Sequence, residues 1–237
     1  MENCNIKMGI RDGLPIGIGY FAVAFAFGLF CMTEGLSVFE ALFISMLNVT
    51  SAGQMAAVPI IAGGGTLIEL AMSQLVINSR YALMSISLSQ KFGKTVRLRD
   101  RFVFGFMNTD EIFAVATGKG TPVGRRYLYG LCLVPFFGWS FGTLLGAVAG
   151  DILPQLLVSA LSVSMYAMFV AIVVPVARDS RPVALAALSS LLLSCIFAFV
   201  PALASVPSGF VIIICAVTVS LAFALLFPIP DEKEGEE

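Results

Sequence analysis

Apolar residues run in long stretches along the chain, and short groups of charged or turn-forming residues separate these stretches. A helix needs roughly 20 apolar residues to cross the hydrocarbon core of a bilayer. Most of the stretches reach that length, so the pattern predicts an all-α integral membrane protein with about eight apolar helical segments. The segments cover residues 13–33, 37–61, 66–90, 102–117, 127–150, 152–177, 182–204 and 209–228.

The composition agrees with this fold class. Hydrophobic residues make up 58% of the 237 residues and charged residues only 12%, whereas a typical soluble domain has about 25% charged residues. The mean hydropathy is +0.95. A soluble protein could not hide so much apolar surface, which excludes an ordinary cytosolic enzyme, a nucleic-acid-binding protein and a disordered chain.

Residue types that usually carry catalysis are sparse. The sequence has no histidine, and its five cysteines are scattered through mostly apolar stretches. No metal-ligand spacing, nucleotide-binding loop or nucleophile–base set stands out. We therefore expect no enzyme activity, no cofactor and no metal site, and we expect the cysteines to pack as small apolar residues.

The distribution of charge predicts the domain organisation. We expect a cytoplasmic N-terminal segment at residues 1–12, one transmembrane transport domain at 13–228 and an acidic cytoplasmic tail at 229–237. A shift of the chain by 116 residues places Pro59 on Pro175 and roughly overlays the first four segments on the last four. Such internal repeats are common in secondary transporters, and this weak one would divide the domain into halves at 13–117 and 127–228.

Basic residues predict the orientation, because connections rich in lysine and arginine stay on the cytoplasmic side. Lys7 and Arg11 place the N-terminus inside, and the basic connections at 91–101 and 119–126 also belong inside. Three full crossings before residue 91 would place the first of these connections outside. One of the first three segments must therefore fail to cross.

Two segments are candidates for broken or re-entrant elements. The middle of segment 37–61 is a polar, glycine-containing stretch from Asn48 to Gln54, between two apolar arms of half length. Segment 102–117 is only sixteen residues long and has basic connections at both ends. Unwound backbone at membrane depth persists only where protein or a water-filled cavity satisfies its polar groups, so two broken segments point to one cavity.

Three charged residues lie deep within apolar sequence: Arg80, Asp110 and Glu111. Counted along helices at about 1.5 Å per residue, Arg80 and Asp110 lie about 16 and 14 Å from the same basic connection. Both values are close to the middle of a hydrocarbon core roughly 30 Å thick. An isolated charge there would cost at least about 2.5–3.5 kcal/mol, so we expect the three residues to pair.

Two interpretations of this cluster stay open. In the first, Arg80 forms a structural ion pair with Asp110 or Glu111. In the second, one cation and two anions bind a zwitterion: Arg80 takes the carboxylate or holds the site, and Asp110 or Glu111 takes the amine or a coupling proton. Neutral polar residues in the same segments would complete the cavity or bond helices together. They include Asn48, Ser51, Gln54, Asn78, Asn108 and Thr109.

Glycines recur at every fourth position in the fifth segment, at Gly138, Gly142, Gly146 and Gly150. This spacing places them on one helix face, which permits close approach of another backbone. Gly9, Gly13 and Gly17 repeat the spacing at the start of the first segment. We interpret both sets as helix-packing faces inside the protein, with a surface for a partner subunit as the alternative.

Several motifs together resemble one family over residues 9–177. They are Gly13-Leu-Pro15 with Gly19-Tyr20, Ser51-Ala-Gly53-Gln54-Met-Ala-Ala, Asn78-Ser-Arg80-Tyr81, Asn108-Thr-Asp110-Glu111 with Phe113, and Trp139 followed by glycines. The chain resembles the AzlC family, the large subunits of bacterial branched-chain amino acid exporters. The resemblance implies export of leucine, isoleucine or valine driven by an ion gradient, together with a small AzlD-like membrane subunit.

The hypothesis from the sequence is therefore a multi-pass transporter of the bacterial inner membrane with its N-terminus in the cytoplasm. It would export branched-chain amino acids by alternating access, coupled to protons through Asp110 or Glu111. The alternatives are a channel, an exporter of another small zwitterionic or apolar solute, and a membrane scaffold that transports nothing. We expect lipid as its surroundings and no nucleic-acid partner.

Overall fold

The computed structural model describes residues 5–119, 122–154, 156–157, 170, 173–203 and 205–228, and within these ranges it is helical without a β-strand. This confirms the predicted class of an all-α membrane protein. The helices are α1 (Ile6–Thr33), α2 (Val38–Leu47), α3 (Ser51–Ala62), α4 (Leu67–Gln90), α5 (Leu98–Met107), α6 (Asp110–Thr117), α7 (Arg125–Ile152), α9 (Arg181–Phe199), the short η1 (Pro201–Leu203) and α10 (Ser208–Leu226).

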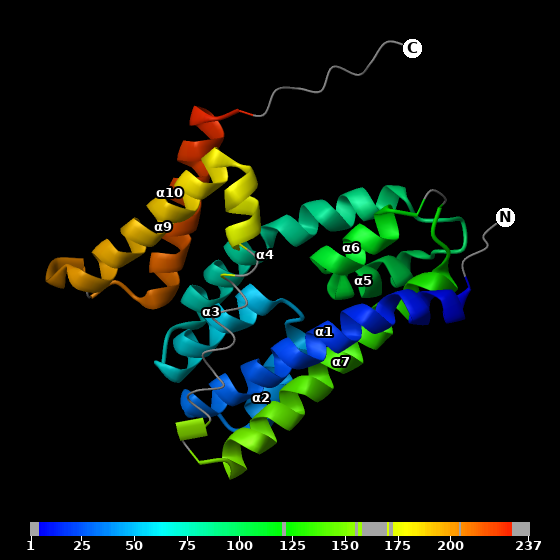
Figure 1. The fold of residues 1–237 in the computed structure, drawn as a ribbon, viewed down its shortest axis with the longest axis horizontal. Helices are drawn as coiled ribbons and strands as arrows, with labels where there is room; N and C mark the ends of the chain where they lie inside the picture. The colour runs from blue at the N-terminus through cyan, green and yellow to red at the C-terminus, as the bar shows by residue number, and fades with distance from the viewer. Residues whose placement is uncertain are drawn as a thin grey trace.

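Helices α1 and α7 are the most extensively packed pair of described helices, and they run side by side in the same direction (Figure 1). Each has 28 residues, or about 42 Å at 1.5 Å per residue. Helix α1 begins earlier than predicted, at Ile6, because Asn5 caps it by accepting a hydrogen bond from the Met8 amide at 3.0 Å. It ends before Gly35, whose φ of 81° a glycine adopts without strain.

The segment predicted at 37–61 is a helical hairpin made of α2 and α3. Leu36, just before α2, and Val58, late in α3, belong to the same buried cluster at the end of α1. Val49, in the break between the two helices, instead packs with Ala24 and Trp139 halfway along α1 and α7. The hairpin therefore runs from the end of α1 to about half the length of α1 and α7. It turns there at Asn48–Thr50 and returns to the end of the molecule where it started (Figure 1).

The segment predicted at 102–117 is a second hairpin, made of α5 and α6, which enters from the opposite end. Helix α5 starts beside the basic connections, and the α6 end returns there, because Lys119 pairs with Asp12 near the start of α1 at 2.8 Å. The chain turns at Asn108 and Thr109. Both predicted broken elements are confirmed, and their breaks meet in the middle of the molecule.

Helix α4 connects the two ends. Its 24 residues span about 36 Å. It passes the first break at Gln74, which accepts a hydrogen bond from Asn48 at 2.9 Å, and the second break at Ser85, which accepts one from Asn108 at 3.2 Å. Four described helices are long and apolar enough to cross a membrane: α1, α7, α9 and α10. Helix α4 is also long enough, but its polar residues keep it out of this set.

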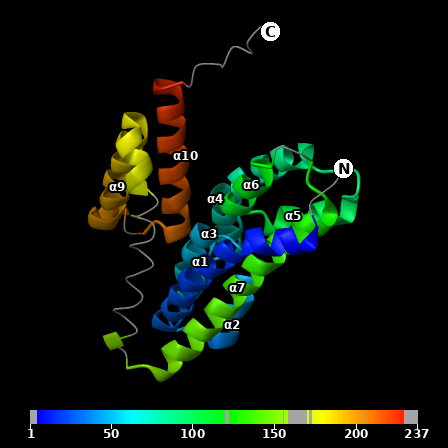
Figure 2. The same ribbon diagram turned by 45° about the vertical axis from the view of Figure 1, so that its right-hand side comes forward.

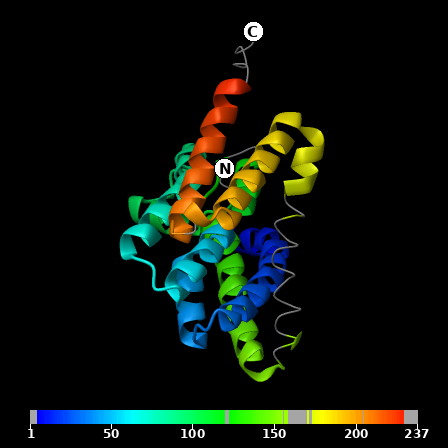
Figure 3. The same cartoon turned by 90° about the vertical axis from the view of Figure 1, so that its left-hand side faces the viewer.

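Helices α9 and α10 lie side by side, and α10 packs against α3 and α4 (Figures 2 and 3). Glu69 fixes this contact: it is only 3% exposed and accepts a hydrogen bond from the Gly209 amide at 2.8 Å. This places a carboxylate at the positive N-terminal end of α10.

The predicted segment at 152–177 lies mostly outside the described residues, as does the acidic tail at 229–237. The proposed repeat needs that segment for a comparison of its two halves, and so stays a prediction. The remaining segments match helices whose bounds differ by a few residues from those predicted.

Candidate functional site

The two breaks meet at a cavity of about 500 Å³ in the middle of the molecule. Helices α1, α4, α6 and α7 contribute to its wall, together with the start of α3. Its lining consists of Pro15, Ile16, Gly19, Tyr20, Val23, Val49, Ser51, Ala52, Arg80, Tyr81, Thr109, Asp110, Glu111 and Trp139. Small-molecule sites in proteins have volumes of roughly 300–1,000 Å³, so the cavity is large enough for one small solute.

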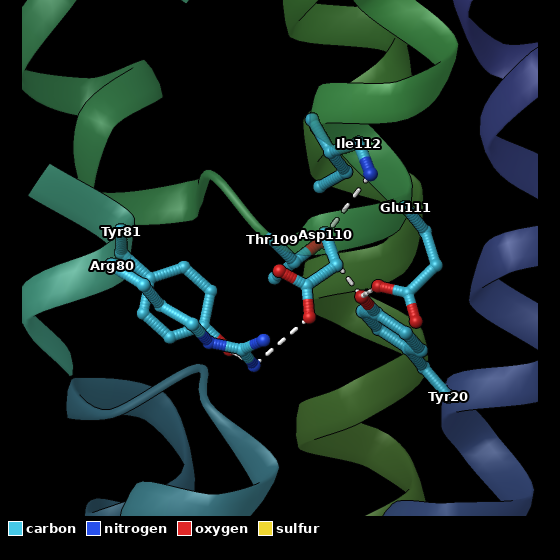
Figure 4. Close-up of polar contacts among 7 residues, drawn as sticks. All are labelled: Tyr20, Arg80, Tyr81, Thr109, Asp110, Glu111 and Ile112. Atoms are coloured by element: carbon cyan, nitrogen blue, oxygen red, sulfur yellow. Dashed lines mark hydrogen bonds and ion pairs between the residues drawn. The ribbon is translucent and has the colours of Figure 1, made fainter. Parts of the chain in front are cut away.

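Arg80 and Asp110 form an ion pair across this cavity, with 2.9 Å between Arg80 Nη2 and Asp110 Oδ2 (Figure 4). Arg80 projects from the middle of α4, and Asp110 is the first residue of α6, which Thr109 caps through the Ile112 amide at 3.5 Å. Arg80 also donates to the Tyr81 hydroxyl at 2.9 Å. The sequence prediction that these charges share one depth therefore matches the observed geometry.

Glu111 has a different partner from Asp110. The Tyr20 hydroxyl of α1 donates a hydrogen bond to the Glu111 carboxylate and lies 2.7 Å from the Thr109 hydroxyl (Figure 4). Glu111 forms no ion pair with any of the described cations. The single arginine thus neutralises one of the two carboxylates, and a phenol holds the other.

The rest of the cavity lining is largely apolar and aromatic. It includes Ile16, Val23 and Val49. Trp139 is 3% exposed and meets the Tyr20 ring edge to face, with 5.0 Å between ring centroids. One cavity thus combines ionic groups with aliphatic and aromatic surface.

Four of the predicted site residues do not reach the cavity wall. Asn48 and Asn78 both donate to the Gln74 side-chain oxygen, at 2.9 and 3.2 Å. Asn108 bonds Ser85 instead. Gln54 is fully buried, and neither atom of its amide has a hydrogen-bond partner in the described part of the chain. Asn48 and Asn108 lie in the two breaks and tie them to α4 through these hydrogen bonds.

The start of α3 faces the cavity through Ser51 and Ala52. Its N-cap residue, Thr50, makes no capping hydrogen bond and instead donates its hydroxyl to Asn48 at 2.7 Å. The first amides of a helix have no intrahelical acceptor and carry a partial positive charge. An uncapped helix start near Arg80 adds a second positive element to the cavity.

The glycines predicted to pack helices lie between α1 and α7. A Cβ at Gly138 would overlap the backbone of Gly17, and one at Gly146 would overlap the Phe25 carbonyl oxygen. A Cβ at Gly142 would lie only 2.5 Å from the Phe21 carbonyl oxygen, and one at Gly150 only 2.7 Å from Met32 Cγ. The structure places this face inside the chain, in contact with α1.

Sequence reasoning missed part of the site. Tyr20, Tyr81 and Trp139 were identified only as parts of the family motifs and not as site residues. The available signal was a tyrosine hydroxyl in an apolar stretch, which needs a partner when buried. Among the described residues, no group of three or more His, Cys, Asp or Glu could hold a metal ion.

These features define the class of protein: a helical integral membrane protein whose broken helices enclose a central polar cavity. The family model for the AzlC protein matches residues 15–153, more than half of the chain. The chain therefore belongs to the AzlC family. The matched region runs from the first turns of α1 to the end of α7 and contains every residue that lines the cavity.

Known relatives are membrane proteins. The chain is 33% identical over 151 residues to the inner membrane protein YgaZ of Escherichia coli (strain K12), and it spans 62% of that relative's length. It is 32% identical over 176 residues to an uncharacterized membrane protein of Archaeoglobus fulgidus. The aligned region covers 73% of this chain and 77% of the relative. An uncharacterized membrane protein of Helicobacter pylori (strain 26695) is 24% identical over 148 residues, covering 60% of this chain and 64% of the relative. No solved structure matches the chain.

Proposed function

We propose that this protein is a secondary transporter of the bacterial inner membrane that exports branched-chain amino acids, couples export to protons and works with a small membrane subunit. The observation that carries the proposal is the central cavity, which combines one cation and two carboxylates with aliphatic and aromatic surface. The resemblance to AzlC exporters supports the choice of substrate. Lys7 and Arg11, together with the basic connections at the same end of the molecule, support a cytoplasmic N-terminus.

The cavity suits the three chemical parts of such a substrate. Arg80 and the uncapped start of α3 would bind the carboxylate, since both are positive and both border the cavity. Asp110, released from Arg80, would bind the ammonium group. Ile16, Val23 and Trp139 would contact the branched side chain.

Glu111 is the proposed proton carrier. Asp110 is paired with the Arg80 guanidinium, whereas Glu111 has a phenol as its partner. The titratable and charged groups around the cavity are Tyr20 on α1, Arg80 and Tyr81 on α4, and Asp110 on α6 itself. Of the two carboxylates in the cavity, Glu111 is the one that forms no ion pair with a described cation, and on this ground we assign the proton to it.

Movement of the hairpins would give alternating access. The α1–α7 pair is closely packed along glycines and provides a rigid support. Hairpins α2–α3 and α5–α6 enter from opposite ends and meet at the cavity, so a small displacement of either would open it to one side. Tyr20 links α1 to α6 at this point and would sense the state of Glu111.

The need for a partner subunit has support from exposure. The side chains of Arg80 and Asp110 are 55% and 46% exposed in the described part of the chain. Charges at membrane depth face water or protein and not lipid, because desolvation without a partner is costly. A small membrane subunit that covers this opening would agree with the family resemblance.

The test is efflux of radiolabelled leucine, isoleucine and valine from proteoliposomes, with and without a proton gradient, for the protein alone and with its small partner. We expect saturable, gradient-dependent export. Arg80→Gln and Asp110→Asn should each reduce it at least tenfold, as loss of a charged hydrogen bond of about 1.5–3 kcal/mol predicts. Glu111→Gln should retain substrate binding and lose the response to the gradient.

A matched control is Glu34→Gln, which removes an exposed carboxylate beyond the end of α1 and should transport like the wild type. Flux that does not saturate would favour a channel. Export of a different zwitterion would change the substrate but keep the mechanism. If Arg80→Gln and Asp110→Asn export at the wild-type rate, and substrate does not stabilise the protein, the proposal is contradicted. The ion pair would then be structural, in a membrane scaffold.

A further inference from the structure

A second cavity, of about 850 Å³, lies at the basic end of the molecule, away from the central cavity. Three stretches of chain form it: the start of α1, the connection after α4, and the first turns of α7 with the residue before them. Its lining consists of Asn5, Ile6, Lys94, Thr95, Arg97, Gly124, Arg125, Arg126, Tyr129 and Leu133. Four of these ten side chains are cations, and none is an anion.

Backbone hydrogen bonds hold these basic stretches together. Gly93 N–H donates to the Val123 carbonyl at 2.9 Å, and Val123 N–H donates to the Lys91 carbonyl at 2.9 Å, which makes an isolated parallel bridge. The Arg125 amide donates to the Thr95 hydroxyl at 3.1 Å. Val123 is fully buried. The fold therefore keeps two basic connections side by side in spite of their mutual repulsion.

Only one of the four cations has a carboxylate partner among the described residues. Arg125 Nε lies 3.0 Å from Asp100 Oδ1. Burial alone would raise the pKa of Asp100, but hydrogen bonds from the Arg97 amide and the Tyr129 hydroxyl, with the Arg125 charge, lower the pKa below its usual value. Asp100 is thus a charged partner for Arg125. Lys94, Arg97 and Arg126 form no ion pair in the described part of the chain.

The start of α7 adds further positive charge. Gly124 is the N-cap and has no side chain, and the hydroxyl of Thr95 accepts from the first amide of the helix in its place. The first turn contains Arg125 and Arg126 and no acidic residue. Acidic residues are the favourable choice at this position, because the helix N-terminus is itself positive. A bound anion in the adjoining cavity would resolve this local conflict.

We propose that this cavity binds a phosphate group, with Arg97, Arg126 and Lys94 as its cationic ligands beside the positive N-terminal end of α7. The chemistry is that of a phosphate monoanion or diester against a basic pocket. It is available from two sources, the headgroup of an anionic phospholipid in the adjacent leaflet and soluble inorganic phosphate. The site is separate from transport chemistry and stands whether or not the proposed substrate is right.

The test measures thermal stability of the full chain in phosphatidylcholine nanodiscs, with three additions: none, phosphatidylglycerol in the disc, and inorganic phosphate in the buffer. The variants are Arg97→Gln, Arg126→Gln and their combination. The control is Arg99→Gln, which removes an exposed cation of the same basic stretch that does not line the cavity. In phosphatidylcholine alone, we expect all variants to melt like the wild type.

We expect phosphatidylglycerol to raise the melting temperature of the wild type and of Arg99→Gln. Each cavity variant should weaken the apparent affinity about fivefold, and the double variant should abolish the shift. The same pattern with inorganic phosphate would assign the site to a soluble anion, and its absence there would assign it to lipid. Equal losses in Arg99→Gln and the cavity variants, or no shift with either addition, would overturn the proposal.

Discussion

At the scale of single residues, two adjacent carboxylates of α6 face different chemical surroundings. Asp110 lies 2.9 Å from the Arg80 guanidinium, and Glu111 accepts a hydrogen bond from the Tyr20 hydroxyl. Adjacent residues on a helix point about 100° apart, because the helix has 3.6 residues per turn. Asp110 therefore turns toward α4 and Glu111 toward α1. Asp110 and Glu111 can therefore have different roles, because the helical backbone points them at different partners.

Tyr20→Phe tests the role of the phenol. The variant keeps the ring against Trp139 and removes the hydroxyl that donates to Glu111. Because hydrogen bonds to charged groups contribute about 1.5–3 kcal/mol, we expect proton-driven efflux to fall about tenfold or more. The measurement is efflux in proteoliposomes, in the wild-type background and in Glu111→Gln.

A double-mutant cycle separates a specific role from a general one. If Tyr20 acts through Glu111, the added Tyr20→Phe change should have no further effect in Glu111→Gln. The same fold reduction in both backgrounds would mean that the hydroxyl acts on another group.

At the scale of elements, the α1–α7 pair and the two hairpins pack in different ways. Helices α1 and α7 touch backbone to backbone along their glycines, so neither can move far without the other. The hairpins meet the rest of the chain through buried side chains, such as Val58 and Ile112, and through polar contacts such as Asn108 to Ser85. The α1–α7 pair thus packs backbone against backbone, whereas the hairpins pack through side chains.

Gly146→Ala tests this division. A methyl group at Gly146 would overlap the Phe25 carbonyl oxygen, so α1 and α7 would have to separate. We expect a loss of roughly 1–3 kcal/mol in stability, as for other overpacked sites, seen as a lower melting temperature in mild detergent. Gly105→Ala is the control, because its nearest foreign atom is the Ser85 hydroxyl at 3.9 Å.

The control should be neutral or slightly more stable, since alanine has a higher helix propensity than glycine. Melting of Gly146→Ala at the wild-type temperature would show that the helices can part at little cost. The rigid role assigned to the α1–α7 pair would then be wrong.

At the scale of the whole molecule, the two helical hairpins decide which connections share a side. The start of α1 and the basic connections before α5 and α7 meet at one end, through the bridge between Phe92 and Val123 and the Lys119–Asp12 pair. The connections at Glu34–Ser37 and Gly63–Thr66 lie at the other end, where α2 begins and α3 finishes. This arrangement removes the conflict between basic connections and three full crossings.

Cysteine labelling tests the arrangement. In a variant without native cysteines, Glu34→Cys, Ala62→Cys and Lys91→Cys place single thiols at exposed positions. We expect a membrane-impermeant maleimide to label the first two from the same side and Lys91→Cys from the opposite side. With the proposed orientation, Lys91→Cys reacts from the cytoplasmic side, so it should be labelled in inverted vesicles and protected in whole cells.

Labelling of Glu34→Cys and Ala62→Cys from opposite sides would mean that 37–61 crosses the membrane fully. The two-hairpin topology would then be wrong at its first element. Labelling of all three positions from the reverse sides would keep the fold and invert only the proposed orientation.

Much of this protein is determined by its sequence alone. Apolar stretches longer than a bilayer core require helices, because lipid offers no hydrogen-bond partner to the backbone. The polar break at Asn48–Gln54, the short length of segment 102–117 and the basic residues on particular connections were enough to predict two broken or re-entrant elements. Arg80 and Asp110 could be placed at one depth by counting residues, since a helix has a constant rise.

Only the tertiary structure decided which polar groups face each other. That Asp110 pairs with Arg80 and Glu111 with Tyr20 depends on the rotation of α6 between α1 and α4, and no count along the chain specifies this rotation. The same holds for Gln74, which gathers Asn48 and Asn78 away from the cavity, and for Glu69, which meets Gly209 from a distant helix. The sequence sets depth through helix rise, whereas packing between helices sets direction.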